Sequence, residues 1–174
     1  MTPVMNDLVI THERGIIHCD IKPENLMISP DGQLVLNLGM MSILHRIHGD
    51  PDAVFCPASE SAIEQYDKTG EIGPWTDVYA MCATIYYCVS GKSLTTWIDR
   101  LAEATPIDLS CFSPAVRQTL QAGLAIKPKD RIQSMHELRQ KLQSAVLNEE
   151  KGKLQPPKTV YGPPGLWSFF RRKR

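Results

Sequence analysis

The chain has 174 residues, 43% of them hydrophobic, which suits one domain of ordinary size with an apolar core. Lys and Arg together number 19, as do Asp and Glu, so the formal net charge of +0 argues against whole-surface binding to nucleic acid, and no nucleic-acid partner is expected. The five cysteines form no C-x-x-C pair, and no secretory signal or bilayer-length apolar run is present. These features predict a cytoplasmic protein with reduced thiols and neither a zinc site nor a disulfide framework.

The first predicted elements are a helix and a hairpin. The helix covers about Thr2–Glu13 and stops at Gly15, and its inner face is predicted from the spacing of Val4, Leu8, Val9 and His12. Residues 26–36 then place two apolar runs around Pro30-Asp31-Gly32, which predicts a short β-hairpin.

Three further helices are predicted downstream of a long loop over residues 40–73. The first follows Pro74, takes Thr76-Asp77 as its N-cap and continues to Gly91; it is apolar all round, so we expect neighbours to bury it. Ser113-Pro114 predicts a cap and first turn for a helix over 115–125. Ser134 and Glu137 form a capping-box pattern for a helix that ends near Leu147.

The segment from Ile16 to Leu26 carries the clearest chemical pattern. His18, Asp20 and Asn25 have the spacing H-x-D-x-x-x-x-N, with Lys22 between them. Because a predicted helix precedes this segment and the hairpin follows it, its polar groups project from a loop that is anchored at both ends.

This pattern resembles the catalytic loop of the protein kinases, in the style of bacterial Ser/Thr kinases. The resemblance implies that Asp20 orients or accepts the proton of a protein hydroxyl and that Lys22 offsets charge on the transferred phosphoryl group. It also implies that Asn25 binds a magnesium ion and that His18 supports the loop backbone. ATP and Mg²⁺ are the cofactors that this family uses.

The resemblance extends downstream. Ala62-Ile63-Glu64 stands where the family has A-P-E, and residues 73–79 resemble the start of its central buried helix. In that alignment Asp77 accepts backbone hydrogen bonds from the catalytic loop, and Arg131 pairs with Glu64 in a buried structural ion pair. The implied fold is mainly α (α+β): a kinase-like C-lobe over residues 1–149, helical with a small hairpin, followed by a flexible Pro-rich basic tail over 150–174.

Other features depart from the family pattern. The residues before Asp20 leave no room for an N-lobe, and no G-x-G occurs in the sequence. Cys19 replaces the arginine that reads an activation-loop phosphate in many kinases. At the metal-binding Asp-Phe-Gly motif, the ungapped alignment gives Leu38 and a one-residue deletion gives Asn37. Neither supplies a carboxylate, although an Asn37 carbonyl oxygen could coordinate a cation weakly.

Three functional hypotheses remain open. The chain is a truncated or degenerate Ser/Thr protein kinase that is inactive alone, which we favour. Alternatively, it is a non-catalytic, pseudokinase-type module that binds a partner protein, or it is competent once another polypeptide supplies an N-lobe. For the tail, Trp167 and Phe169-Phe170 beside the basic residues 171–174 are compatible with a solvated end or with weak contact to an anionic membrane, which would place the protein near one.

Overall fold

The computed structural model describes residues 1–37, 59–67, 69–103 and 106–154. Five α-helices make up half of this part: α1 (Thr2–Glu13), α3 (Pro74–Ser90), α4 (Trp97–Ala102), α5 (Pro114–Gly123) and α6 (Met135–Leu154). Short 3-10 turns lie at Pro23–Asn25, Ile63–Gln65 and Pro128–Asp130. The architecture is therefore mainly helical, as predicted, and no helix within these ranges is long and apolar enough to cross a membrane.

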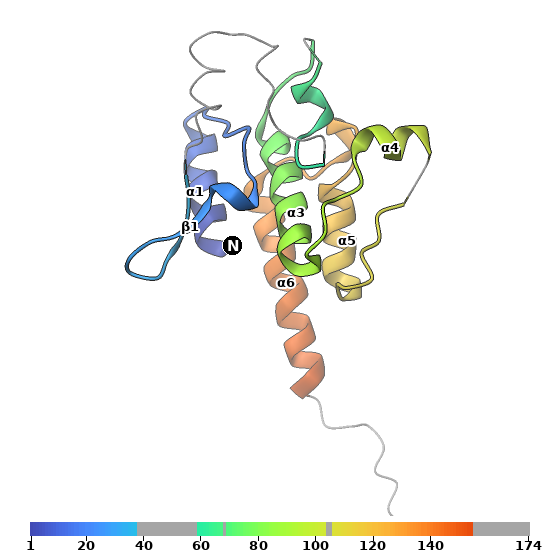
Figure 1. The fold of residues 1–174 in the computed structure, drawn as a ribbon. Coiled ribbons are helices and arrows are strands. Elements are labelled where there is room, and N and C mark those ends of the chain that lie inside the picture. Colours follow the sequence, from blue (N-terminus) through green and yellow to red (C-terminus); the bar gives the residue numbers. More distant parts are fainter. Residues whose placement is uncertain (38–58, 68, 104–105, 155–174) are drawn as a thin grey trace, which may run out of the picture.

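Helix α3 forms the centre of the molecule (Figure 1). Its residues from Thr76 to Thr84 are all buried, and α5 and α6 pack against it. The predicted burial is confirmed over this stretch, but it was wrong for the end of the helix, where residues 87–89 are exposed. Within it, Thr84 donates to the Ala80 carbonyl at 2.8 Å, so its hydroxyl is satisfied inside the core.

The start of α3 differs from the prediction. The helix begins at Pro74 with Gly73 as its N-cap, so the expected Thr76-Asp77 cap was wrong. Pro74 fits the first helical position because its missing N–H would have no intrahelical partner there. Thr76 instead lies in the first turn, where its hydroxyl accepts from the Gly73 amide and donates to Glu64.

The close approach of α5 to α3 requires a glycine. A Cβ atom on Gly123 would lie 2.4 Å from the Cys82 sulfur, which is far inside van der Waals contact. Gly123 therefore lets the two helices meet at the cost of a weaker helix end. α5 ends there, two residues before its predicted end.

The predicted hairpin is present as β1 (Leu26–Ile28) and β2 (Leu34–Leu36), an antiparallel pair with Met27 opposite Val35. Gly32 has φ +82°, the left-handed conformation that glycine adopts without strain, and its amide donates to the Ser29 carbonyl. Strand β2 contacts α1, whose predicted bounds are those observed.

Helix α6 continues to Leu154, beyond its predicted end at Leu147 and beyond the expected start of the tail at residue 150. The hydroxyl of Ser134 accepts from the Glu137 amide, as the capping pattern predicted. The remaining tail residues, 155–174, and the loop from 40 to 58 lie outside the described residues.

Candidate functional site

A buried carboxylate holds the backbone of the predicted catalytic loop through hydrogen bonds. Asp77, in the first turns of α3, is fully buried and accepts from the backbone amides of His18 at 2.8 Å and Cys19 at 2.9 Å. The His12 ring, near the end of α1, lies 2.8 Å from the same carboxylate. Cys19 has φ +62°, a left-handed turn that presents both amides to Asp77. The backbone bonds expected of Asp77 are present.

The three residues predicted to act in chemistry come together in the loop. Asp20 is 5% exposed, and its Oδ1 lies 2.8 Å from the Lys22 ammonium. The Asn25 amide donates to Asp20 Oδ2 at 2.9 Å and to the Asp20 carbonyl at 2.7 Å. Because the amide nitrogen makes both bonds, the amide oxygen is the atom of Asn25 that can face a cation. The Asp20 carboxylate is held in one orientation by its neighbours on both oxygens.

His18 connects the loop to the end of the hairpin. Its Nδ1 accepts from the Asp20 amide at 3.3 Å, and its Nε2 donates to the Asn37 carbonyl at 3.0 Å. These roles fit the neutral Nε2–H tautomer. The Asn37 amide in turn donates to the Asn25 carbonyl at 2.8 Å. His18 therefore lies where a support for the loop backbone was predicted.

The donor set fits magnesium poorly. Mg²⁺ prefers oxygen ligands that include carboxylates, but the Lys22 ammonium, 2.8 Å from Asp20 Oδ1, would repel a cation at this carboxylate. The Asn37 side chain is exposed and uncharged, while Leu38 lies outside the described residues. Within the described ranges no three His, Cys, Asp or Glu side chains are grouped to hold a metal ion.

A buried ion pair anchors the segment that precedes α3. Arg131 makes two bonds to Glu64, at 2.6 Å and 3.2 Å, and both side chains are almost fully buried. Its three other donor contacts go to the carbonyls of Trp75, Ala125 and Ile126. The guanidinium therefore makes five hydrogen bonds, which matches its donor capacity. The predicted pair is present, in the bidentate geometry that favours Arg over Lys.

Two neighbours of the loop were not predicted. Gln65 accepts from the Ala62 amide at 3.2 Å and donates to the Cys19 carbonyl at 2.8 Å, so it ties the Ile63–Gln65 turn to the loop. Glu60 lies close enough to interact electrostatically with the charged residues of the loop. Burial raises the pKa of Glu60, the Glu24 and Asp20 carboxylates raise it further, and the Lys22 ammonium lowers it. Both residues are about 40 positions from the loop, so no local pattern could have shown the contact.

A scan against models of protein families found no match. Among curated proteins, the chain is 30% identical over 183 residues to serine/threonine-protein kinase F of Synechocystis sp., covering 95% of this chain and 34% of that protein. It is 25% identical over 135 residues to serine/threonine-protein kinase PknA of Mycobacterium tuberculosis, covering 73% of this chain and 31% of that protein. It is 27% identical over 94 residues to serine/threonine-protein kinase PknL of the same species, covering 53% of this chain and 24% of that protein. The chain thus spans about a third or less of these relatives.

Solved structures give the same result for the fold. The apo form of PpkA-294 superposes with a TM-score of 0.66 and 28% identity, covering 80% of this chain and 51% of that one. The Mycobacterium tuberculosis PknI kinase domain gives a TM-score of 0.60 and 21% identity, covering 83% of this chain and 52% of the other. The match therefore covers about half of each of these two structures.

Proposed function

We propose that this chain, which has the fold of a protein-kinase C-lobe and bacterial Ser/Thr protein kinases as its relatives, is a kinase-like domain whose own phosphoryl transfer is absent or severely reduced. The observation that carries the proposal is that the contacts around Asp20 are present while a metal-binding carboxylate is missing beside them. The frame around Asp20 is complete, whereas the position that should bring a metal-binding carboxylate holds Asn37 or Leu38, depending on the alignment, and neither is a carboxylate.

Asp20 is the residue that this geometry suits for chemistry. Its carboxylate is held by Lys22 and Asn25, so it could orient a Ser or Thr hydroxyl and accept its proton without first reorganising. Lys22 would then stand beside the charge on a transferred phosphoryl group. ATP and Mg²⁺ are the family's cofactors, and neither Asn37 nor Leu38 would offer Mg²⁺ a negative charge.

A second candidate is a pseudokinase-type module that binds a partner protein. It is favoured by the Asp77 contacts and the Glu64–Arg131 pair, which need neither nucleotide nor metal to form. A partner that supplies an N-lobe is the special case in which binding and catalysis would be combined.

The decisive assay is transfer of labelled phosphate from ATP, with magnesium, to a generic protein substrate. We expect the chain to give no more transfer than its Asp20→Ala variant. Magnesium-dependent transfer that Asp20→Ala abolishes would overturn the proposed loss of activity. Variants Asn37→Asp and Leu38→Asp test the cause: the one that restores the metal ligand should gain thermal stabilisation by ATP with magnesium, through mass action.

The binding alternative has a separate test. A partner that recognises the folded surface should still bind Asp20→Ala, because that change leaves the loop frame in place. It should be lost with Asp77→Ala, which removes the carboxylate that holds the loop. Loss of binding in Asp20→Ala with an intact fold would instead make the partner a substrate-like ligand of the catalytic loop.

A further inference from the structure

An apolar groove lies at the end of the molecule opposite the catalytic loop. It has a volume of about 710 Å³ and is bounded by the start of α1, the end of α3, the start of α5 and the middle of α6. Its apolar walls include Ile85, Val89, Phe112, Leu142 and Val146. The loop, in contrast, lies at the end of α1 and the start of α3, so the groove is a separate feature.

Several groove side chains are poorly covered by the described residues. Val89 is 56% exposed, Val146 47% and Leu147 54%, although all three are apolar and lie around one depression. Apolar surface gathered in this way marks a binding site more often than scattered exposed residues do. The volume lies within the usual range for sites that enclose a small ligand or a few side chains.

We propose that the groove is occupied by the chain's own C-terminal segment, through Trp167, Phe169 and Phe170. Helix α6 builds one wall and delivers the chain to the right place: it ends at Leu154, seven residues beyond the groove residue Leu147 and so about 10 Å along the axis. The segment from 155 to 166 contains 12 residues and can span up to about 40 Å. It is therefore long enough to turn back and place the aromatic residues in the groove.

Beyond the groove, α6 carries an acidic side chain that lacks a partner among the described residues, while the charged residue that lines the groove itself is Arg139. Glu149 lies one helical turn beyond Val146, and its Oε1 is buried with no hydrogen-bond partner among the described residues. The C-terminal segment is basic, with Arg171-Arg172-Lys173-Arg174 directly after the aromatic residues and Lys158 before them. A cationic side chain of this segment would supply the partner that Glu149 lacks.

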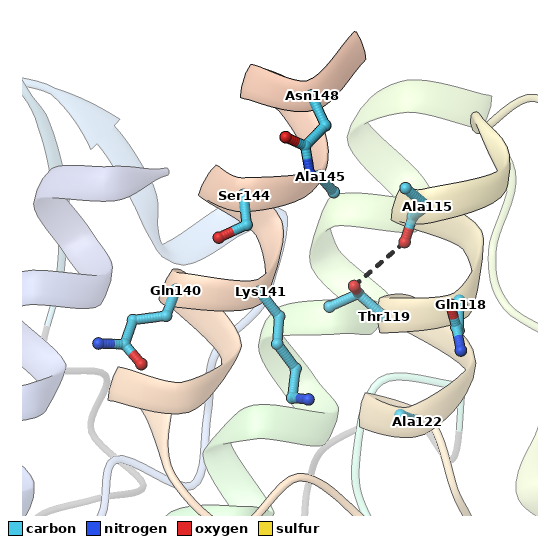
Figure 2. Close-up of a pocket in the computed structure, with 9 residues that line it drawn as sticks. All are labelled: Ala115, Gln118, Thr119, Ala122, Gln140, Lys141, Ser144, Ala145 and Asn148. Atoms are coloured by element: carbon cyan, nitrogen blue, oxygen red, sulfur yellow. Dashed lines mark hydrogen bonds between the residues drawn. The ribbon is translucent and has the colours of Figure 1, made fainter.

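The neighbouring groove between α5 and α6 is a poorer match for this segment. Figure 2 shows it lined by Gln118, Gln140, Lys141, Ser144 and Asn148, with alanines between them. The hydroxyl of Thr119 is already used inside α5, where it donates to the Ala115 carbonyl. Aromatic rings placed there would bury polar groups without partners, which costs free energy.

The first test is methyl NMR on the full 174-residue chain. Aromatic rings seated in the groove shift the methyl signals that they cover, so Trp167→Ala and Phe170→Ala should each move the signals of Val89 and Val146. Ser168→Ala is the matched control and should leave them in place. Unmoved Val89 and Val146 signals in both aromatic variants would overturn the proposal. So would shifts that vanish on dilution together with a dimer mass, because the occupant would then be a second copy.

The reciprocal test changes the groove. Val146→Asp should release the segment and raise acrylamide quenching of Trp167, measured as the difference from a Trp167→Phe chain. The control Ile98→Asp alters an equally exposed apolar residue on α4, outside the groove, and should have no effect. Trp167 that becomes protected only when anionic phospholipid vesicles are added would mean that the segment binds membrane instead. The proposal does not depend on catalysis, so Asp20→Ala should leave the acrylamide quenching of Trp167 as it is in the unmodified chain.

Discussion

Asp77 determines the conformation of the catalytic loop although it has no predicted role in the chemistry. Its carboxylate has no solvent exposure and receives two backbone amides and the His12 ring. A buried charge is tolerated only when hydrogen bonds replace its hydration. The loop supplies those bonds, so the stability of Asp77 and the conformation of the loop depend on each other.

We therefore expect Asp77→Ala to lower the free energy of unfolding by about 3–5 kcal/mol, the usual cost of removing one member of a buried charged cluster. Urea denaturation measures this value. His12→Gln leaves the two backbone amides paired and should cost clearly less. Hydrogen exchange at the His18 and Cys19 amides should accelerate strongly in Asp77→Ala, and unchanged protection there would contradict the assigned role.

Cys82 gives stability a specific pH dependence. Burial raises its pKa from 9.0 to about 12. Above pH 9 the unfolded thiol loses its proton while the folded one keeps it, so the native state binds more protons than the unfolded state. The contribution to stability is full below pH 9 and is lost as the pH rises toward 12.

The measurement is urea denaturation between pH 8 and pH 10.5, for the chain and for Cys82→Ala. The unmodified chain should lose stability more steeply, with a difference in slope of up to roughly 1.4 kcal/mol per pH unit. Equal slopes would show that the Cys82 thiol ionises in the folded protein as it does in the unfolded one. Only the slopes are compared, because the substitution also changes packing against Gly123.

Between elements, the Glu64–Arg131 pair joins three pieces of chain that no helix connects directly. It links the Ile63–Gln65 turn, the first turn of α3 through the Trp75 carbonyl, and the loop between α5 and α6 through Ala125 and Ile126. The backbone hydrogen bonds of the turn itself are short-range, so its long-range anchors are this pair and the Gln65 bond to the Cys19 carbonyl.

Arg131→Met should lower the free energy of unfolding by about 3–5 kcal/mol, because Glu64 is left buried without its partner. Adding Glu64→Leu should recover much of that loss, since well-packed apolar residues can replace a buried pair. The control is Lys141→Met, which breaks an exposed contact of 3.6 Å to Glu137 and should change stability by less than about 0.5 kcal/mol. No recovery in the double variant would point to the carbonyl contacts of Arg131 rather than to the pair.

Sequence pattern predicted the elements whose signals are local. The bounds of α1, the turn at Gly32 and the burial of α3 follow from periodicity and turn chemistry within a few residues. Helix α4 was missed because six residues give too short a pattern, and tertiary contacts stabilise it: Arg100 reaches the Leu124 carbonyl at 2.8 Å and the Tyr79 hydroxyl at 3.5 Å. The start of α3 was misplaced because Thr76 bonds to Glu64, a long-range contact.

The residues of the site also divide into those that are close in sequence, which could be predicted, and those that are distant, which could not. Asp20, Lys22 and Asn25 lie within six positions, so their spacing alone indicated that they would meet. Glu60 and Gln65 reach the loop through the folding of a long segment, which spacing does not encode. Their catalytic roles stay predictions, because geometry shows where groups lie and an assay must show what they do.

For the whole molecule, the hairpin leaves an apolar surface uncovered by the described residues. Ile28 is 68% exposed and Met27 49%, so both apolar side chains are open to solvent. We predict that a hydrophobic dye such as ANS fluoresces with the purified chain and that the double change Met27→Gln and Ile28→Thr weakens the signal. Ile10→Thr on α1, about half exposed, is the control for apolar surface elsewhere. A dye-silent, thermally robust monomer would contradict this prediction.

The contacts of Asp77 also fix when the site can form during folding. Its partners at 12, 18 and 19 lie 65, 59 and 58 positions earlier in the chain. Closing a loop of that length costs entropy that is repaid only after α3 has docked on α1, so the catalytic loop should be among the last parts to become ordered. During synthesis the first third of the chain would emerge with its chemical residues present and its site unformed. Order in the loop would then report that the central helix has been made and is in place.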